Sequence, residues 1–194
     1  MKDYISLFEN GECLYENQNY EKALETFKKL YILNPSNTNA NYIACCYIGL
    51  GEFDKAEKLL ISLANTSHWE TVHYNLARVY MAQKNFDDAF NCLGEAIEIN
   101  PENSDCFFYL GVFYEKIKDY KKAINNYKHA VQLSDNSQDI SIYFNNIGLC
   151  YYKMDDNDNA LQYYKLSLDM DKNNDDAKYN MNLIVNPAGG KNHE

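Results

Sequence analysis

Hydrophobic and polar positions along this chain alternate with the spacing of helices, and one pattern returns at intervals of about 34 residues. A small residue marks the same point of each interval, with separations of 33, 33, 34 and 37 residues, at Gly11, Ala44, Ala77, Gly111 and Gly148. An alanine follows each small residue by twelve positions, at Ala23, Ala56, Ala89, Ala123 and Ala160. The chain is therefore built from one structural unit that occurs five times.

Each unit contains two amphipathic segments. In the fourth unit the first segment places Phe107, Leu110, Gly111 and Tyr114 at i, i+3, i+4 and i+7, which is one buried stripe of a helix. In the second segment a large apolar residue follows the alanine by one helical turn, at Phe27, Leu60, Leu93, Tyr127 and Tyr164. Small residues are needed where two helix axes approach closely, because a larger side chain there costs about 1–3 kcal/mol. Each unit is thus predicted to be a pair of antiparallel helices.

Polar residues and prolines mark the helix ends. The residue four before each alanine is a candidate N-cap, at Asn19, Glu52, Asn85, Asp119 and Asp156. Pro35 and Pro101 stop the second helix of their units. The predicted helix pairs cover 4–17 and 20–33, 37–50 and 53–66, 70–83 and 86–99, 104–117 and 120–133, and 141–154 and 157–170. Residues 134–140 are predicted to form a longer surface turn that accounts for the 37-residue spacing.

A further segment over about 175–185 has Ala177, Met181, Ile184 and Val185 on one side, which predicts a helix that caps the stack. Residues 186–194 are predicted to be a disordered tail. We therefore expect a single domain over 1–185, with repeats over about 4–36, 37–69, 70–103, 104–137 and 141–174.

Composition narrows the classes of function. Among 194 residues, three prolines and eight glycines favour a mostly helical protein, and a net charge of −10 argues against a nucleic-acid partner. No stretch reaches the roughly 18 apolar residues of a membrane span, and the first residues lack a secretory signal, so we expect no membrane partner and a cytoplasmic protein. The six cysteines lack paired spacings and are interpreted as packing thiols, with Cys13, Cys46 and Cys150 forming an apolar column.

A helix-turn-helix of about 34 residues with these small, aromatic, alanine and proline sites resembles the tetratricopeptide repeat, over residues 4 to about 185. The resemblance implies an all-α, right-handed superhelical solenoid of five repeats plus the C-terminal capping helix. It also implies a concave groove that is lined by the first helix of each repeat and binds extended peptides or partner proteins. The resemblance implies a scaffold and does not name its ligand.

In that geometry, the first-helix residues three before, two before, one after and four after the small residue face the groove. The peptide-binding residues that this implies are Asn41, Tyr42, Tyr74, Asn75, Arg78, Phe108, Tyr109, Asn145, Asn146 and Tyr152. Asparagine can satisfy both the donors and the acceptors of a peptide backbone, and aromatic rings can cover its side chains. The alternative is that these residues only reflect composition, because the chain has 18 tyrosines. At the same positions in the first repeat, Glu9 and Glu12 favour a ligand with basic residues at that end.

The hypothesis from the sequence is a protein–protein interaction scaffold or adaptor that binds an extended peptide or partner segment, of unknown identity, in its concave groove. Two alternatives stay open: a chaperone for secreted or unfolded clients, and a structural protein that assembles into homo-oligomers. We expect no enzyme, no catalytic residues and no cofactor, because no activated nucleophile or phosphate-binding loop is present. We expect no metal site either, because His68 and His73 lack further ligands at zinc spacing.

Overall fold

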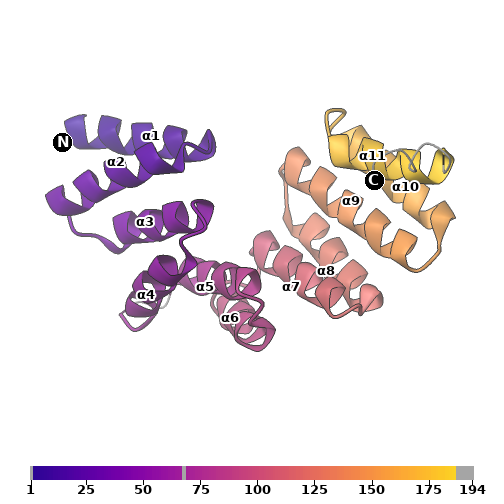
Figure 1. Ribbon diagram of the computed structural model, residues 1–194, viewed down its shortest axis with the longest axis horizontal. Coiled ribbons are helices and arrows are strands. Elements are labelled where there is room, and N and C mark those ends of the chain that lie inside the picture. The colour runs from indigo at the N-terminus through magenta and orange to yellow at the C-terminus, as the bar shows by residue number, and fades with distance from the viewer. Residues whose placement is uncertain (1, 67–68, 187–194) are drawn as a thin grey trace. The chain divides into compact units, whose positions relative to one another are not determined.

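The computed structural model describes residues 2–66 and 69–186, which form eleven helices and no strand. The chain is divided into two compact units, Met1–Pro101 and Glu102–Glu194. The first unit contains α1 (Lys2–Glu16), α2 (Tyr20–Leu33), α3 (Asn37–Gly49), α4 (Phe53–Ala64), α5 (Glu70–Ala82) and α6 (Phe86–Ile99). The second contains α7 (Ser104–Lys116), α8 (Tyr120–Leu133), α9 (Ser137–Lys153), α10 (Asn157–Met170) and α11 (Asp175–Val185), as Figure 1 shows. The all-α repeat fold expected from the sequence is confirmed.

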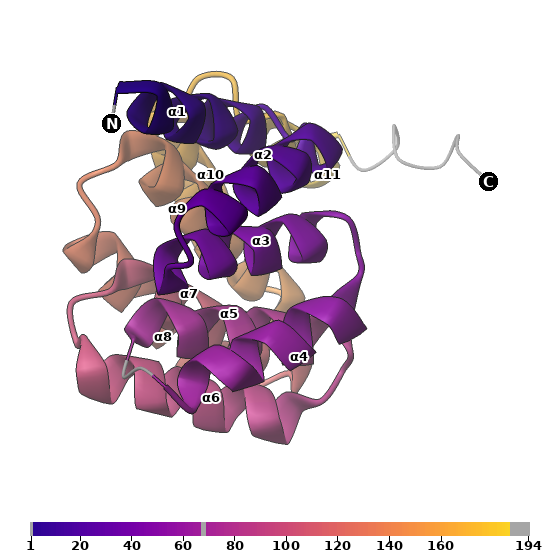
Figure 2. The ribbon, with the colours of Figure 1, turned by 90° about the vertical axis from the view of Figure 1, so that its left-hand side faces the viewer.

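Within each unit every helix packs against the next one along the chain. Figure 2 shows this order for α1, α2, α3 and α4 of the first unit. The odd-numbered helices α1, α3, α5, α7 and α9 are the first helices of the five repeats, and α2, α4, α6, α8 and α10 are the second helices. No helix in the part of the chain that the structure describes has the length and apolar character that crossing a membrane requires.

The start of α9 corrects one expectation from the sequence. This helix begins at Ser137, so the surface turn predicted over 134–140 is wrong in its second half. The side chain of Asn136 accepts hydrogen bonds from the backbone amides of Gln138 and Asp139, at 2.9 and 3.4 Å, and thereby caps the helix early. The extra residues of the 37-residue spacing therefore lengthen a first helix by about one turn instead of forming a loop.

The turns inside the repeats share one backbone feature. Each has a residue with a positive φ, between 59° and 72°, at Gln18, Gly51, Lys84, Lys118 and Asp155. Only one of these residues is glycine, so the sequence marks only one of the five left-handed positions. All five expected N-cap residues occupy cap positions, but only Asp119 and Asp156 accept a hydrogen bond from a helix amide, while Asn19, Glu52 and Asn85 do not.

The core of each repeat lies where its two helices approach. Gly11, Gly111 and Gly148 face the rings of Phe27, Tyr127 and Tyr164, and these three rings are fully buried. In the second repeat Ala44 and Leu60 share one hydrophobic cluster, and both are fully buried. The small sites and the residues one turn after each alanine are therefore the contacts that hold the first helix against the second.

The helix predicted over 175–185 is α11, which packs mainly against α10 and buries Ala177. Its cap residue, Asn174, donates its side-chain amide to the hydroxyls of Ser141 and Ser167, at 2.9 and 3.1 Å. Both serines are buried, so this contact closes a polar cluster between α9 and α10. The disordered tail predicted over 186–194 lies outside the described residues, apart from Asn186.

Candidate functional site

Five of the ten predicted binding residues belong to the first unit and come from α3 and α5. Together with two residues of α1 they form one surface, here called the first-helix face, which consists of Glu12, Tyr15, Asn41, Tyr42, Tyr74 and Arg78, with Asn75 beneath it. All six surface residues are half-buried. They are therefore held in place by the protein and still present part of their surface to solvent.

Asn75 connects the helices under this face. Its side chain is 1% exposed, and its Nδ2 donates to Asn41 Oδ1 at 3.1 Å and to Cys45 Sγ at 3.2 Å. Its Oδ1 accepts a hydrogen bond from Arg78 Nη1 at 3.1 Å. Three of the four hydrogen-bonding positions of the amide are thus used inside the protein. Asn75, which the sequence places in the groove, supports the surface from below.

Arg78 is the only basic residue of the face, and several groups fix its position. In addition to Asn75, it hydrogen-bonds Tyr15, and its guanidinium carbon lies 5.6 Å from the centre of the Tyr74 ring. Stacking of this kind suits a guanidinium because the ring face is electron-rich. Burial raises the pKa of Tyr15 to about 12, so its hydroxyl keeps its proton at neutral pH.

Tyr42 is held from two sides. Its hydroxyl donates to Glu12 Oε1 at 2.5 Å, and its ring stacks on Phe27 with 4.4 Å between ring centres. Burial raises the pKa of Tyr42, and the hydrogen bond to the Glu12 carboxylate raises it further. The carboxylate at α1 and the guanidinium at α5 give the face an acidic and a basic end.

The other five predicted residues lie in the second unit, on α7 and α9. Phe108 stacks on Tyr143, with 5.1 Å between ring centres, and contacts the ring of Tyr109. Asn145 is 7% exposed because the capping helix reaches it: Asn180 Nδ2 donates to Asn145 Oδ1 at 3.0 Å. On the same helix as Asn145, the structure leaves Asn146 half-buried and Tyr152 exposed.

Asparagine pairs about one repeat length apart are the feature that the sequence reasoning missed: one pair joins two successive repeats, and the other joins the fifth repeat to the capping helix. Asn41 and Asn75 are 34 residues apart, and Asn145 and Asn180 are 35 apart. In each pair the later asparagine donates to the earlier one. The recurrence of asparagine at one repeat length is a signal for contact between repeats, whereas the resemblance assigns these residues to ligand binding.

Among the described residues, neither the buried cysteines Cys46 and Cys150 nor the histidines form a reactive or metal-binding site. Cys46 and Cys150 are fully buried, and burial raises the pKa of each thiol to about 12, so neither is an activated nucleophile. Cys13 is exposed, which corrects its placement in an apolar column. Among the described residues no three of His, Cys, Asp and Glu lie close enough to hold a metal ion. His73 Nδ1 lies 2.7 Å from Glu95 Oε2, and His68 is outside the described residues.

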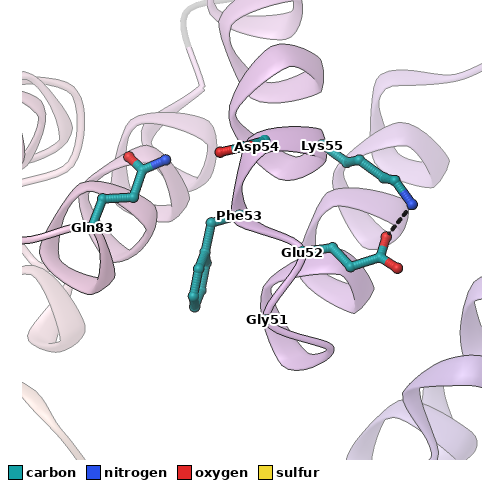
Figure 3. Close-up of a pocket in the computed structure, with 6 residues that line it drawn as sticks. All are labelled: Gly51, Glu52, Phe53, Asp54, Lys55 and Gln83. Carbon is teal, nitrogen blue, oxygen red and sulfur yellow. Dashed lines mark ion pairs between the residues drawn. The ribbon is translucent and has the colours of Figure 1, made fainter.

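An open hollow of about 360 Å³ lies at the turn between α3 and α4, next to the end of α5. Figure 3 shows its lining residues, Gly51, Glu52, Phe53, Asp54, Lys55 and Gln83. Lys55 Nζ and Glu52 Oε2 point toward one another at 2.6 Å, and Gln83 donates to Glu57 at 2.9 Å. Glu52, Lys55 and Gln83 are thus paired with neighbouring side chains, and we assign no chemistry to the hollow.

The repeat unit seen in sequence and structure matches a known family along most of the chain. Sequence models described as "Tetratricopeptide repeat" match residues 14–68, 71–103 and 104–173. The chain belongs to the tetratricopeptide repeat family. This confirms the resemblance that the small, aromatic, alanine and proline positions indicate.

Known proteins similar to this tetratricopeptide repeat chain are longer or share only its fold. BBSome complex member BBS4 of Bos taurus is 25% identical over 108 residues, which is 55% of this chain and 21% of that protein. Anaphase-promoting complex subunit 3 of Schizosaccharomyces pombe is 32% identical over 116 residues, 58% of this chain and 16% of that protein. The crystal structure of a thermophilic TPR protein of Thermus thermophilus has a TM-score of 0.82 at 20% identity and covers 94% of this chain and 98% of its own. The chain thus spans about a fifth of the length of the curated relatives it matches.

Proposed function

We propose that the protein is a protein–protein interaction scaffold and that the first-helix face of its N-terminal unit binds an extended polypeptide segment. The observation that carries this proposal is the network around Arg78, Tyr74, Asn75 and Tyr15, which fixes half-buried aromatic and polar groups on one surface. Tetratricopeptide repeats supply the architecture, and the two curated relatives are named as members of multiprotein complexes. No cofactor and no reaction is part of the proposal.

The chemistry of the face suits a peptide. Half-buried tyrosines offer a flat apolar surface together with a hydroxyl, and such residues give large contact areas at a low cost in side-chain entropy. Asn41 adds an amide that can meet a backbone donor or acceptor. An extended segment needs both kinds of contact, because its backbone groups lose water when it binds.

Fixed positions lower the cost of binding. Arg78 is held by Asn75 and Tyr15, and Tyr42 is held by Glu12 and Phe27, before any ligand arrives. Each rotamer-rich side chain that is already ordered saves about 0.5–1.5 kcal/mol of ordering free energy on binding. The network therefore acts as preorganisation for the residues that would touch the ligand.

The charges of Arg78 and Glu12 favour one orientation of the bound peptide on the first-helix face. Arg78 on α5 favours a carboxylate of the ligand, and Glu12 on α1, with the exposed Glu9 on the same helix, favours a basic residue. The proposed ligand is thus a segment with aromatic or aliphatic residues between a basic end and an acidic end. Reversing those two charges in the ligand should weaken binding most.

A random peptide library displayed on phage tests the proposal without requiring that a partner be identified first. Selection on the intact protein should enrich a common sequence pattern, and the Y74A/R78M variant should lose affinity for the enriched peptides by at least about tenfold. The matched control is K28M/Y31A, which removes an exposed tyrosine and a lysine that covers the ring of Tyr47, both from α2. Equal losses in the two variants, or enrichment of no pattern, would contradict the proposal.

A further inference from the structure

The turn between the helices of the fourth repeat differs in charge from the other four. We compare the seven residues that begin five positions after each small residue, which are 16–22, 49–55, 82–88, 116–122 and 153–159. Residues 116–122 contain Lys116, Lys118, Lys121 and Lys122 against Asp119, a net charge of +3. The first three turns each carry −1 and the fifth carries −2. One turn of an acidic protein is therefore strongly basic.

The four lysines and Ile117 are here called the basic turn. All four lysines are exposed to solvent. Ile117 lies between two of them and is 51% exposed. Lys122 Nζ lies 3.4 Å from Asp119 Oδ2, and this surface pair neutralises only one of the four charges. The basic turn thus combines an excess of positive charge with an exposed apolar side chain.

Helix stability does not explain the lysines of the basic turn. The first turns of α2, α4, α6 and α10 each contain an acidic residue, which interacts favourably with the positive end of the helix dipole. The first turn of α8 contains none and instead carries Lys121 and Lys122. These charges oppose the dipole, so the sequence departs here from the arrangement that the other second helices share.

The groups around the basic turn limit what it can bind. Lys128, further along α8, is directed toward Tyr163, with its Nζ 5.5 Å from the ring centre. Glu115, just before the basic turn, accepts a hydrogen bond from the buried Tyr127. The next turn along the chain carries Asp155, Asp156 and Asp158. A long polyanion that extended onto this acidic turn would be repelled there.

We propose that the basic turn is a second interaction surface, separate from the first-helix face, which binds a short acidic segment of a partner polypeptide. Charge complementarity identifies the acidic side chains, and Ile117 supplies an apolar contact for a hydrophobic residue among them. Nucleic acid fits less well, because its charge continues over many nucleotides while the protein carries −10 overall.

The test uses a fluorescent 11-residue peptide of alternating Glu and Asp around a central Leu, with a Gln and Asn copy as the neutral probe. The variant K116Q/K118N/K121Q/K122Q removes the basic turn, and Asn is chosen at 118 because φ is 63° there. The control K22Q/K29Q/K58Q/K84N removes four exposed lysines elsewhere, including Lys84, whose φ is also 63°. Both variants have the same net charge, so the nonspecific effect of net charge on peptide binding is the same in both.

We expect the intact protein and the control to bind the acidic peptide with affinities within about twofold of one another at 50 mM salt, and the basic-turn variant to bind it at least about tenfold more weakly. Equal weakening in both variants would overturn the proposal, as would equal affinity for the acidic and neutral peptides. Tighter binding of an oligothymidylate of equal charge would assign the surface to nucleic acid instead. Salt-sensitive self-association lost only in the basic-turn variant would assign it to a second copy of the chain.

Discussion

Gly111 lies directly against the ring of Tyr127, so that a Cβ atom on this glycine would clash with Tyr127 Cε1. Gly148 and Tyr164 have the same relationship, with 2.6 Å between such a Cβ and Tyr164 Cε1. In the second and third repeats the small residue is alanine, and the residue sixteen positions later is leucine instead of an aromatic. The side chains at these two positions therefore fill a space of constant size, either as glycine with an aromatic residue or as alanine with leucine.

Gly111→Ala is expected to destabilise the protein by about 1–3 kcal/mol, although alanine is normally the better helix residue. The reason is that the fully buried Tyr127 ring must shift to admit the methyl group. Urea unfolding followed by circular dichroism measures the change. The control is Gly94→Ala on α6, where the new Cβ meets nothing within 4 Å and should stabilise the helix by up to about 1 kcal/mol.

The same volume argument predicts non-additivity. Tyr127→Leu should make room for the methyl group, so the G111A/Y127L variant should be less destabilised than the sum of the two single changes. This variant would reproduce the alanine and leucine combination of the second and third repeats. Additive losses would show that the glycine is not required by the ring.

The hydroxyls of Tyr127 and Tyr164 give a third prediction. Tyr127 donates to Glu115 Oε2 at 3.1 Å, whereas the buried Tyr164 hydroxyl has no hydrogen-bond partner among the described residues. Removing a buried, unpaired hydroxyl recovers its desolvation cost, and removing a paired one loses a bond and leaves its acceptor unpaired. We expect Tyr164→Phe to stabilise the protein by about 1 kcal/mol and Tyr127→Phe to destabilise it by a similar amount. Chemical denaturation of the two variants measures both changes, and an equal response would contradict this explanation.

The sequence predicts the repeat fold well because its signals are local and recur five times. Small residues, alanines and apolar residues at one helical turn define the helix pairs, and α2, α6, α8, α10 and α11 have the predicted bounds. The sequence does not predict the local backbone where a single capping side chain or the geometry of a turn determines it. Asn136 caps α9 early, and non-glycine residues such as Asp155 adopt positive φ because the turn geometry of the repeat requires it.

The candidate site is only partly predictable from the sequence. Position in the repeat places Tyr42, Tyr74 and Arg78 on the first helices α3 and α5, which are in contact, and their role in ligand binding stays a prediction. Position in the repeat does not reveal that Asn75 and Asn145 are buried. An asparagine that hydrogen-bonds a neighbouring helix and one that hydrogen-bonds a ligand can occupy the same position of the repeat. Only the structure distinguishes the two roles, through the partner that each amide has.

The contact of Asn180, on the capping helix α11, provides a fourth prediction. Asn180→Ala removes the donor to the buried Asn145 Oδ1 and should destabilise the second unit by about 1–3 kcal/mol, because that oxygen is left unpaired. Hydrogen exchange of the amides in α9 and α11 measures the effect locally. The matched control is Asn182→Ala on the exposed side of α11, which should change protection little. Equal effects of the two changes would refute a specific role for the Asn145 contact.

Stability should also fall at alkaline pH. The pKa values of Cys46 and Cys150 are raised from 9.0 to about 12 by burial, so the folded protein retains thiol protons that the unfolded chain releases above pH 9. Because the unfolded state then binds fewer protons, the free energy of unfolding decreases as pH rises from 9 toward 12. Denaturation at a series of pH values from about 8 to about 10 measures this slope. Cys150→Ala should reduce it and Cys13→Ala, at an exposed position, should not; the same slope in both variants would contradict the assignment.

The most direct test of the central claim, that the first-helix face binds a polypeptide segment, is site-specific photo-crosslinking to a peptide enriched by phage selection. A benzophenone amino acid would replace Met81, a half-buried residue of α5, or Ile61, a 41% exposed residue of α4. We predict peptide crosslinks from position 81 that an excess of unlabelled peptide suppresses, and only background from position 61. Competable crosslinks from position 61, with background at position 81, would contradict the claim and move the binding surface to the second helices.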